Sequence, residues 1–259
     1  MDKLDFNAEQ YRRASGHQKE WGKEIIGQLP LSGYERIIDL GCGDGMLTAE
    51  LAARVPAGFV LGIDSSDGMI EAAAKLASDN LSFSRMDIND MDFVEAFDVA
   101  FSNATLHWIK DHRRMLEAVM RSLRPCGWAR FNFAAAGTGK PFDEAVGQVM
   151  KRPLFAAAFN DFQWPWYMPA GEEYDELVRS AGFREAKVWS ENKDRWFDNS
   201  DVMIRWVDQP CLIPFLAVLP PADRQRFREE VVEEITRRTV GADGRCFVPF
   251  RRINLLARK

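Results

Sequence analysis

Cysteine and histidine are scarce in this chain. The 259 residues include three histidines and four widely separated cysteines, namely Cys42, Cys126, Cys211 and Cys246. A zinc site or a disulfide framework needs such residues at short, regular spacings, and no C-x-x-C pair is present. We therefore expect reduced thiols and no bound metal.

Long apolar runs are also absent. No stretch approaches the roughly 18 apolar residues that a membrane-spanning helix requires. The first residues, MDKLDFNAEQYRRASGHQ, lack the apolar segment of a secretory signal. These observations predict a cytoplasmic protein that does not act in a membrane.

Positive charge is not in excess. The chain has 34 Lys plus Arg against 39 Asp plus Glu, a formal net charge of −5. This balance is unfavourable for a protein that binds phosphate backbones or anionic lipid, so nucleic acid is not an expected partner. The 46% apolar content is sufficient for one sizeable core, or for one core with a small cap.

Short apolar runs alternate with amphipathic segments over the first half of the sequence. The apolar runs predict strands at 35–40, 58–64, 81–87, 97–103 and 127–136, whereas helical spacing predicts helices at 8–28, 46–55, 67–77 and 112–123. Strands that alternate with helices in this way are joined by right-handed parallel crossovers. The fold class is therefore α/β, with a doubly wound, mostly parallel sheet of seven strands.

The regular alternation stops after Gly137. Residues 138–171 and 193–245 are rich in aromatic residues and interrupted by proline, and neither is long enough to bury a good core alone. We interpret them as segments of a helical cap whose rings mostly pack together. The predicted division is 1–137 for the N-terminal helix and cofactor-binding core, 138–171 for cap, 172–192 for core, 193–245 for cap, and 246–259 for the final core strand.

A glycine-rich turn follows the first predicted strand. In the sequence DLGCGDG, Gly41, Gly43 and Gly45 occupy alternate positions between a strand and a helix. Glycine is required where the backbone has positive φ or where a ligand lies against the main chain. The helix that follows presents free N–H groups to a ligand carboxylate or phosphate. Asp39 precedes the turn, and we expect loop N–H groups or water beside the ligand to satisfy its carboxylate.

A second acidic residue is expected beside this turn. Asp64 ends the second apolar run, where a doubly wound sheet places a carboxylate that can accept two hydrogen bonds from a ribose diol. The sequence therefore predicts a nucleoside-bearing ligand. A dinucleotide is disfavoured, because the third glycine of G-x-G-x-x-G would fall at Met46.

The pattern E/D-x-G-x-G-x-G with a downstream acid resembles the cofactor motif of class I S-adenosylmethionine-dependent methyltransferases, and the resemblance covers nearly the whole chain. It implies a Rossmann-like methyltransferase fold and S-adenosyl-L-methionine as cofactor. It also implies that the three glycines line the methionine part and that Asp64 holds the ribose hydroxyls. The remaining implied contacts are the adenine face for Met69, the adenine amino edge for Asp87 and Ile88, and the methyl group for Asn103.

Two further segments resemble one branch of that family. The segment LHW at 106–108 and the N-terminal YRRASGHQKEW are similar to trans-aconitate methyltransferases and juvenile hormone acid methyltransferases. This resemblance implies O-methylation of a carboxylate on a small molecule. Gln18 and Trp108 would donate hydrogen bonds to that carboxylate, and Tyr11 would pack near the methyl group. Such an enzyme is expected to be a monomer or a weak homodimer.

Other functions remain open from the residues alone. A phenolic, amine or carbon acceptor would need a proton acceptor such as His107, whereas a carboxylate acceptor needs none. A carrier-bound acyl substrate and a non-catalytic nucleoside-binding regulator are further alternatives. Arg195 and Arg205, in the second cap segment, are candidates for a carboxylate clamp.

Overall fold

The computed structural model describes residues 16–259, which form two compact units. The first unit includes residues up to Ala135, Trp166–Glu191 and Arg252–Lys259, and the second includes Ala136–Pro165 and Asn192–Arg251. The predicted cap segments overlap largely with the second unit. Each unit is described separately below.

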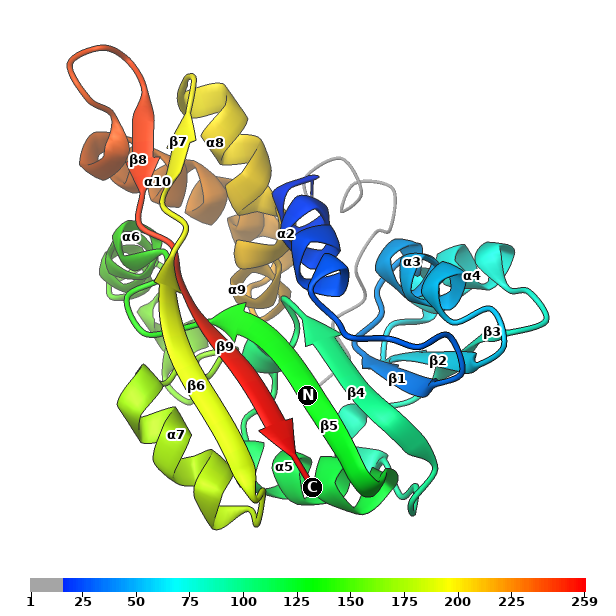
Figure 1. The fold of residues 1–259 in the computed structure, drawn as a ribbon. Helices are drawn as coiled ribbons and strands as arrows, with labels where there is room; N and C mark the ends of the chain where they lie inside the picture. Colours follow the sequence, from blue (N-terminus) through cyan, green and yellow to red (C-terminus); the bar gives the residue numbers. More distant parts are fainter. Residues whose placement is uncertain (1–15) are drawn as a thin grey trace. The chain divides into compact units, whose positions relative to one another are not determined.

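The first unit contains a seven-stranded sheet with the order β3-β2-β1-β4-β5-β9-β6 (Figure 1). Neighbouring strands from β3 to β5 are parallel, and β9 runs antiparallel to β5. The predicted α/β fold with a mostly parallel seven-stranded sheet is therefore confirmed. The strands are β1 Arg36–Leu40, β2 Phe59–Asp64, β3 Leu81–Arg85, β4 Phe97–Asn103, β5 Leu123–Ala134, β6 Glu185–Asn192 and β9 Arg251–Arg258.

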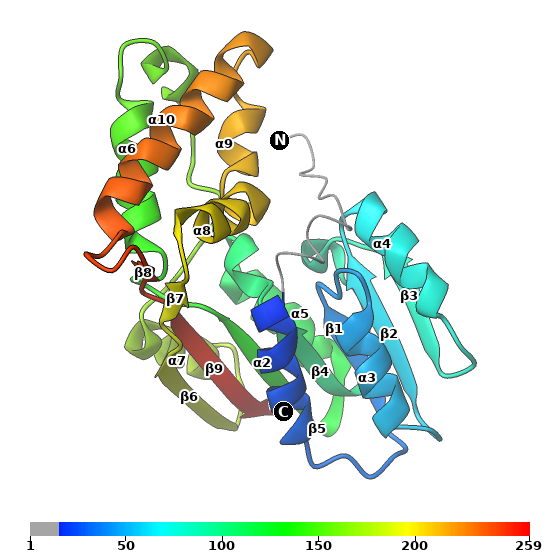
Figure 2. The ribbon, with the colours of Figure 1, turned by 90° about the horizontal axis from the view of Figure 1, so that it is seen from above.

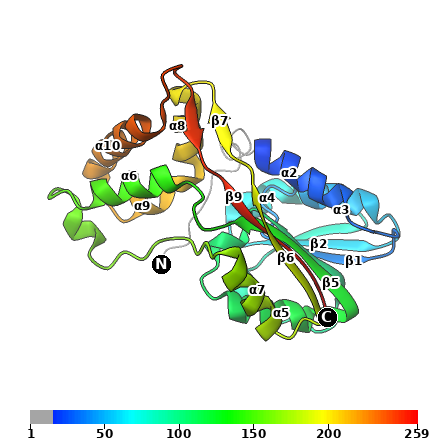
Figure 3. The same ribbon diagram turned by 60° about the vertical axis from the view of Figure 1, so that its left-hand side comes forward.

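Helices cover both faces of this sheet. In Figure 3, α2 (Gly16–Gly27) and α3 (Met46–Arg54) lie on one face, and α5 (His112–Ser122) and α7 (Gly171–Ser180) lie on the other. The part of the predicted helix 8–28 that precedes Gly16 lies outside the described residues. The remaining short helices of the unit are α4 Asp67–Ala73, η1 Ala74–Leu76, η2 Ile88–Asp90 and η3 Leu106–Trp108.

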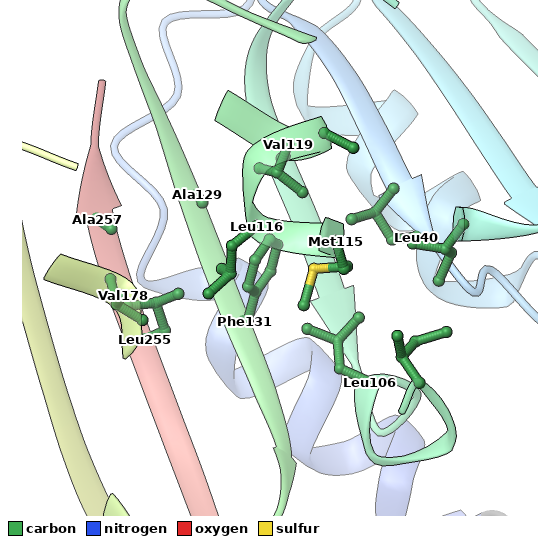
Figure 4. Close-up of a cluster of buried hydrophobic side chains, with 14 of the residues drawn as sticks. Leu40, Leu106, Met115, Leu116, Val119, Ala129, Phe131, Val178, Leu255 and Ala257 are labelled. Carbon is green, nitrogen blue, oxygen red and sulfur yellow. The ribbon is translucent and has the colours of Figure 1, made fainter. Parts of the chain in front are cut away.

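The two faces of the sheet bury different side chains of the same strands. In β1, Ile37 belongs to the cluster beneath α2 and α3, whereas Ile38 belongs to the cluster beneath α5 and α7. This division follows from the two-residue period of a strand. Figure 4 shows the second cluster, in which Met115, Leu116 and Val119 of α5 lie against Ala129 and Phe131 of β5. Burial on both faces explains why these strands are apolar throughout.

The second unit is mainly helical. Figure 2 shows α6 and α10 side by side, and the aromatic rings of the unit pack together around them. Phe155 contacts Phe227 with ring centroids 5.1 Å apart, and Phe142 contacts Phe215 at 5.9 Å. The elements of the unit are α6 Lys140–Met150, η4 Ala156–Phe159, β7 Arg195–Phe197, α8 Ser200–Trp206, η5 Val207–Cys211, α9 Ile213–Ala217, α10 Pro221–Thr239 and β8 Cys246–Val248.

The expected final strand is divided in the structure. We predicted that 246–259 belongs entirely to the main sheet, but Cys246–Val248 (β8) pairs instead with β7 in a separate two-stranded sheet. Pro249 follows β8, and a proline has no N–H with which to continue a ladder. The main-sheet strand β9 therefore begins only at Arg251.

None of the helices within residues 16–259 combines the length and the apolar character needed to span a bilayer. Within the same residues, no group of three or more His, Cys, Asp or Glu side chains is arranged to hold a metal ion.

Candidate functional site

An open pocket lies at the carboxyl ends of β1 and β4. These two strands are neighbours in the sheet although they are not consecutive in the sequence, so the strand order reverses here. Ligands of open α/β sheets bind at such a switch point. The pocket lining combines three acidic or basic groups with bare backbone, and its residues are Lys19, Asp39, Gly41, Cys42, Gly43, Asp44, Leu47, Phe101, Asn103, Ala104 and Thr105.

The three glycines of the turn have positive φ, with values of 74° at Gly41, 54° at Gly43 and 78° at Gly45. A Cβ atom at Gly41 would lie 2.0 Å from Thr105 Cγ2, and one at Gly45 would lie 2.8 Å from Phe83 Cζ. A Cβ at Gly43 would meet no atom within 4 Å. Gly41 and Gly45 are therefore required by packing of the protein itself, whereas Gly43 lies next to open space in the pocket.

Asp64 is hydrogen-bonded to the glycine turn. One carboxylate oxygen accepts from the backbone N–H of Gly43 at 3.0 Å, and the other accepts from Ser66 at 2.9 Å. Burial raises the pKa of Asp64, and the hydrogen bonds from Ser66 and Gly43 oppose that rise. A carboxylate oxygen accepts more than one hydrogen bond, so Asp64 retains acceptor capacity for a hydroxyl-bearing ligand beside the turn.

Asp39 is an almost completely buried acid in the wall of the pocket. Its side chain is 2% exposed and accepts a hydrogen bond from Thr48 Oγ1 at 2.7 Å. Burial, with a smaller contribution from the negative charge of Asp64, raises the pKa of Asp39 to about 7. We expected loop N–H groups or water to satisfy Asp39, and the described partner is instead a side-chain hydroxyl of α3. A ligand ammonium group in the pocket would favour the ionised carboxylate.

The loop after β4 forms the opposite wall of the pocket. Ala104 has a φ of 58°, which is strained for a residue with a Cβ atom. Thr105 Oγ1 donates to the carbonyl of Gly41 at 3.0 Å, so this loop is tied to the glycine turn. Asn103 Oδ1 accepts from Arg252 Nη2 at 3.2 Å, which orients the amide at the pocket. The strained backbone and its hydrogen bonds thus fix the shape of this wall.

Lys19 and Asp44 form an ion pair that sequence reasoning missed. Lys19 Nζ lies 2.9 Å from Asp44 Oδ2, and their side chains are 22% and 5% exposed. Asp44 lies within the DLGCGDG turn and was overlooked because only the glycines follow a recognised spacing. Lys19 is on α2, whose position over the turn is a tertiary feature without a signal in the sequence. The pair places both signs of charge at the pocket.

Three other predicted cofactor residues, Met69, Asp87 and Ile88, are not among the pocket-lining residues. Met69 is buried in α4, with 4% exposure, and Ile88 packs in the hydrophobic core with 5% exposure. Asp87 caps η2 and accepts from both the backbone N–H and the side-chain amide of Asn89, each at 2.9 Å. The structure therefore brings Asp39, Gly41, Gly43 and Asn103 together in one pocket, and Gly45 and Asp64 are likewise not among its lining residues. The cofactor contacts of all these residues stay predictions.

The predicted acceptor residues are only partly described. Trp108 is half-buried in η3, and its ring contacts those of His107 and Trp166 at 5.3 and 5.9 Å between centroids. Tyr11 and the side chain of Gln18 lie outside the described part of the molecule. His107 Nδ1 is buried without a hydrogen-bond partner among the described residues, and burial lowers the pKa of this histidine to about 3.

A mostly parallel sheet with a glycine turn after β1 and an acid at the end of β2 is typical of nucleoside-binding α/β proteins. Residues 37–127 match the family model described as a methyltransferase domain. The chain is 30% identical over 234 residues to a trans-aconitate 2-methyltransferase of Deinococcus radiodurans, covering 86% of this chain and 87% of that protein. It is 31% identical over 263 residues to an uncharacterised methyltransferase of Schizosaccharomyces pombe, covering 98% of each.

The fold also matches solved structures. One of them is a phosphoethanolamine N-methyltransferase 2 of Haemonchus contortus in complex with phosphomonomethylethanolamine and S-adenosylhomocysteine, with a TM-score of 0.63 and 19% identity. The match covers 97% of this chain and 56% of that one. The chain belongs to the class I S-adenosylmethionine-dependent methyltransferases and uses S-adenosylmethionine as its cofactor.

The residues of the pocket fit this cofactor. Its methionine part carries an ammonium and a carboxylate group, and the pocket offers Asp39 and Asp44 as well as Lys19. The open space at Gly43, which a Cβ atom would enter, leaves bare backbone for a ligand to lie against.

The turn allows a paired stability prediction. We expect Gly43→Ala to lower the free energy of unfolding by about 1 kcal/mol, because only the left-handed backbone is strained. Gly45→Ala should lower it by roughly 2–4 kcal/mol, because the new methyl group also collides with Phe83 and Ala73. Urea denaturation of the ligand-free variants measures both values. Equal losses would contradict the packing role of Gly45.

Asp39 allows a prediction about pH. Its pKa is raised in the folded protein, so ionisation of its carboxyl group destabilises the fold. The loss of stability grows between about pH 4 and pH 7 and is constant above pH 7. Asp39→Asn should therefore be more stable than the wild type at pH 8, by on the order of 2–4 kcal/mol, and this gap should shrink toward pH 4. Urea denaturation of both proteins at several pH values tests this. A wild type that is the more stable protein at pH 8 would contradict the prediction.

Proposed function

We propose that this methyltransferase transfers the methyl group to a carboxylate of a small organic acid similar to trans-aconitate. The observation that carries the proposal is the environment of the His107 side chain, which precedes Trp108 in the chain. The low pKa of this histidine, about 3, makes it a weak base, and no carboxylate orients its buried Nδ1 among the described residues. A carboxylate acceptor is already a nucleophile at neutral pH and needs no base.

The relatives support the same acceptor class. The similarity to the D. radiodurans trans-aconitate 2-methyltransferase extends over 86% of this chain, so it is not confined to the cofactor-binding half. A trans-aconitate 2-methyltransferase of Mycobacterium tuberculosis is 28% identical over 95% of this chain.

The cofactor, when bound, supplies an electrophilic methyl group on a sulfonium. We assign its methionine part to the glycine turn, with Asp39 facing the ammonium group and Lys19 the carboxylate. Asp64 would accept hydrogen bonds from the ribose hydroxyls, and its existing bond to Gly43 holds it beside the turn. The adenine contacts are assigned to Met69, Asp87 and Ile88.

The wall formed by β4 would face the transferred methyl group. Asn103 is held by Arg252, which is itself 2% exposed, so the amide can keep one orientation while the acceptor binds. We assign Trp108 to the acceptor carboxylate as a hydrogen-bond donor, together with Gln18 and with Tyr11 near the methyl group. These residues orient the acceptor and exclude water, which are the main requirements of an in-line displacement.

The cofactor assignments predict a selective loss of binding. Gly43→Val should abolish detectable binding of S-adenosylmethionine, because its side chain enters the open space at the turn. Asp64→Asn should weaken binding by about 1–3 kcal/mol, because the ionised acceptor is lost and the amide NH2 cannot accept the N–H bond from Gly43 or Ser66 that it replaces. Isothermal titration calorimetry measures both affinities. Unchanged affinity in either variant would require a different assignment of that residue.

The acceptor class predicts different effects at two neighbouring residues. With trans-aconitate, His107→Gln should retain more than about half of kcat/KM, because no proton must be removed from the acceptor. Trp108→Phe should lose about tenfold, which is the value of one hydrogen bond to a charged group. Steady-state assays with labelled cofactor measure both.

Loss of most activity in His107→Gln would instead favour the phenolic, amine or carbon acceptors. Saturable binding of cofactor without turnover of any carboxylate, phenol or amine would favour a non-catalytic nucleoside-binding regulator.

A further inference from the structure

Arg195 is a buried cation that lacks a counterion in the second unit. Its side chain lies on β7 and is 6% exposed, and none of the described carboxylates forms an ion pair with it. Its Nη1 atom is buried and has no hydrogen-bond partner among the described residues. Burial lowers the pKa of Arg195 to about 10, so the group stays charged at neutral pH. A buried, unpaired guanidinium is strongly unfavourable unless something outside the described chain compensates it.

Two aromatic rings lie against this guanidinium. Its central carbon lies 4.7 Å from the ring centroid of Phe197 and 4.9 Å from that of Trp206. Ring faces stabilise the flat face of a guanidinium, but they do not accept the in-plane N–H bonds at its edge. The rings therefore restrict the orientation of Arg195 and leave its buried Nη1 without an acceptor among the described residues.

Trp206, whose ring lies against the guanidinium, carries a second unsatisfied donor. It is 7% exposed on α8, and its indole Nε1 is also buried without a partner among the described residues. An indole N–H is only a donor, as is every N–H of Arg195. Two donors and one positive charge are suited to an anion with two acceptor oxygens, whereas a water molecule would leave the charge uncompensated.

We propose that Arg195 and Trp206 form a binding site for one carboxylate group within the second unit. A carboxylate matches the single charge of Arg195 and offers two oxygens to the two donors. The carboxylate belongs either to the methyl acceptor or to a separate organic acid that regulates the enzyme. The first source rests on the proposed function, and the second does not.

The first experiment detects the site without methyl transfer. The unfolding temperature of the ligand-free enzyme is measured in sodium tricarballylate and in sodium chloride of equal ionic strength. The wild type should show a rise of a few degrees that depends on tricarballylate concentration, because a ligand that binds only the folded state stabilises it. Arg195→Met should lose this rise and should be at least as stable as the wild type in chloride, because an unpaired buried charge has been removed.

Two further variants separate the site from general effects of charge. Arg205 lies on the same helix as Trp206 but is exposed, so Arg205→Met should keep the full rise. Trp206→Phe keeps an aromatic ring and removes only the N–H, and it should weaken tricarballylate binding several-fold. This variant also tests the site if Arg195→Met fails to fold. The proposal is overturned if the wild type shows no rise beyond chloride, or if both Arg195→Met and Trp206→Phe keep the full rise.

Kinetics then distinguish the two sources of the carboxylate. An increase of about tenfold or more in the KM for trans-aconitate in Arg195→Met, with kcat and cofactor affinity unchanged, supports a carboxylate of the acceptor. An unchanged KM together with loss of the thermal effect supports a separate organic acid. If no carboxylate is methylated even by the wild type, the proposed function fails, and the thermal measurements still decide whether the site exists.

Discussion

The rest of the site depends on the hydrogen bond between the Gly43 N–H and the Asp64 carboxylate. It joins the turn after β1 to the end of β2, and the Thr105 hydroxyl joins the same turn to the loop after β4. The two bonds hold three strand ends in one geometry. Because Gly41 and Gly45 are also packed against Thr105 and Phe83, the turn can leave one face open at Gly43 and remain rigid.

The pocket combines this rigidity with uncompensated charge. Asp39 is buried with one hydroxyl partner, and its raised pKa records the cost of ionising it in the ligand-free protein. In the second unit, Arg195 is in a comparable situation with the opposite sign. Burial disfavours the charged form of both groups, and both are suited to a ligand of opposite charge. Groups of this kind are typical of functional sites, where stability is reduced in favour of binding.

The sequence predicts those features that depend on local pattern. The alternation of apolar runs and helices predicted the seven-stranded sheet, and the spacing of glycines and acids predicted the turn and Asp64. Features that depend on tertiary contacts were not predictable. The Lys19–Asp44 ion pair needs α2 to lie over the turn, and the buried Asn103–Arg252 bond joins residues 149 positions apart. The final strand was predicted too long because its apolar pattern continues through Pro249, although proline cannot continue a ladder there.

The surroundings of Cys42 also determine the chemical durability of the site. This cysteine lies in the middle of the glycine turn, is 8% exposed, and has a thiol pKa raised well above its usual value by burial and by the charges of Asp39 and Asp64. Thiolates, rather than thiols, react with alkylating agents and peroxides. Burial and the acidic neighbours favour the protonated thiol of Cys42, which is the form that reacts least with alkylating agents and peroxides.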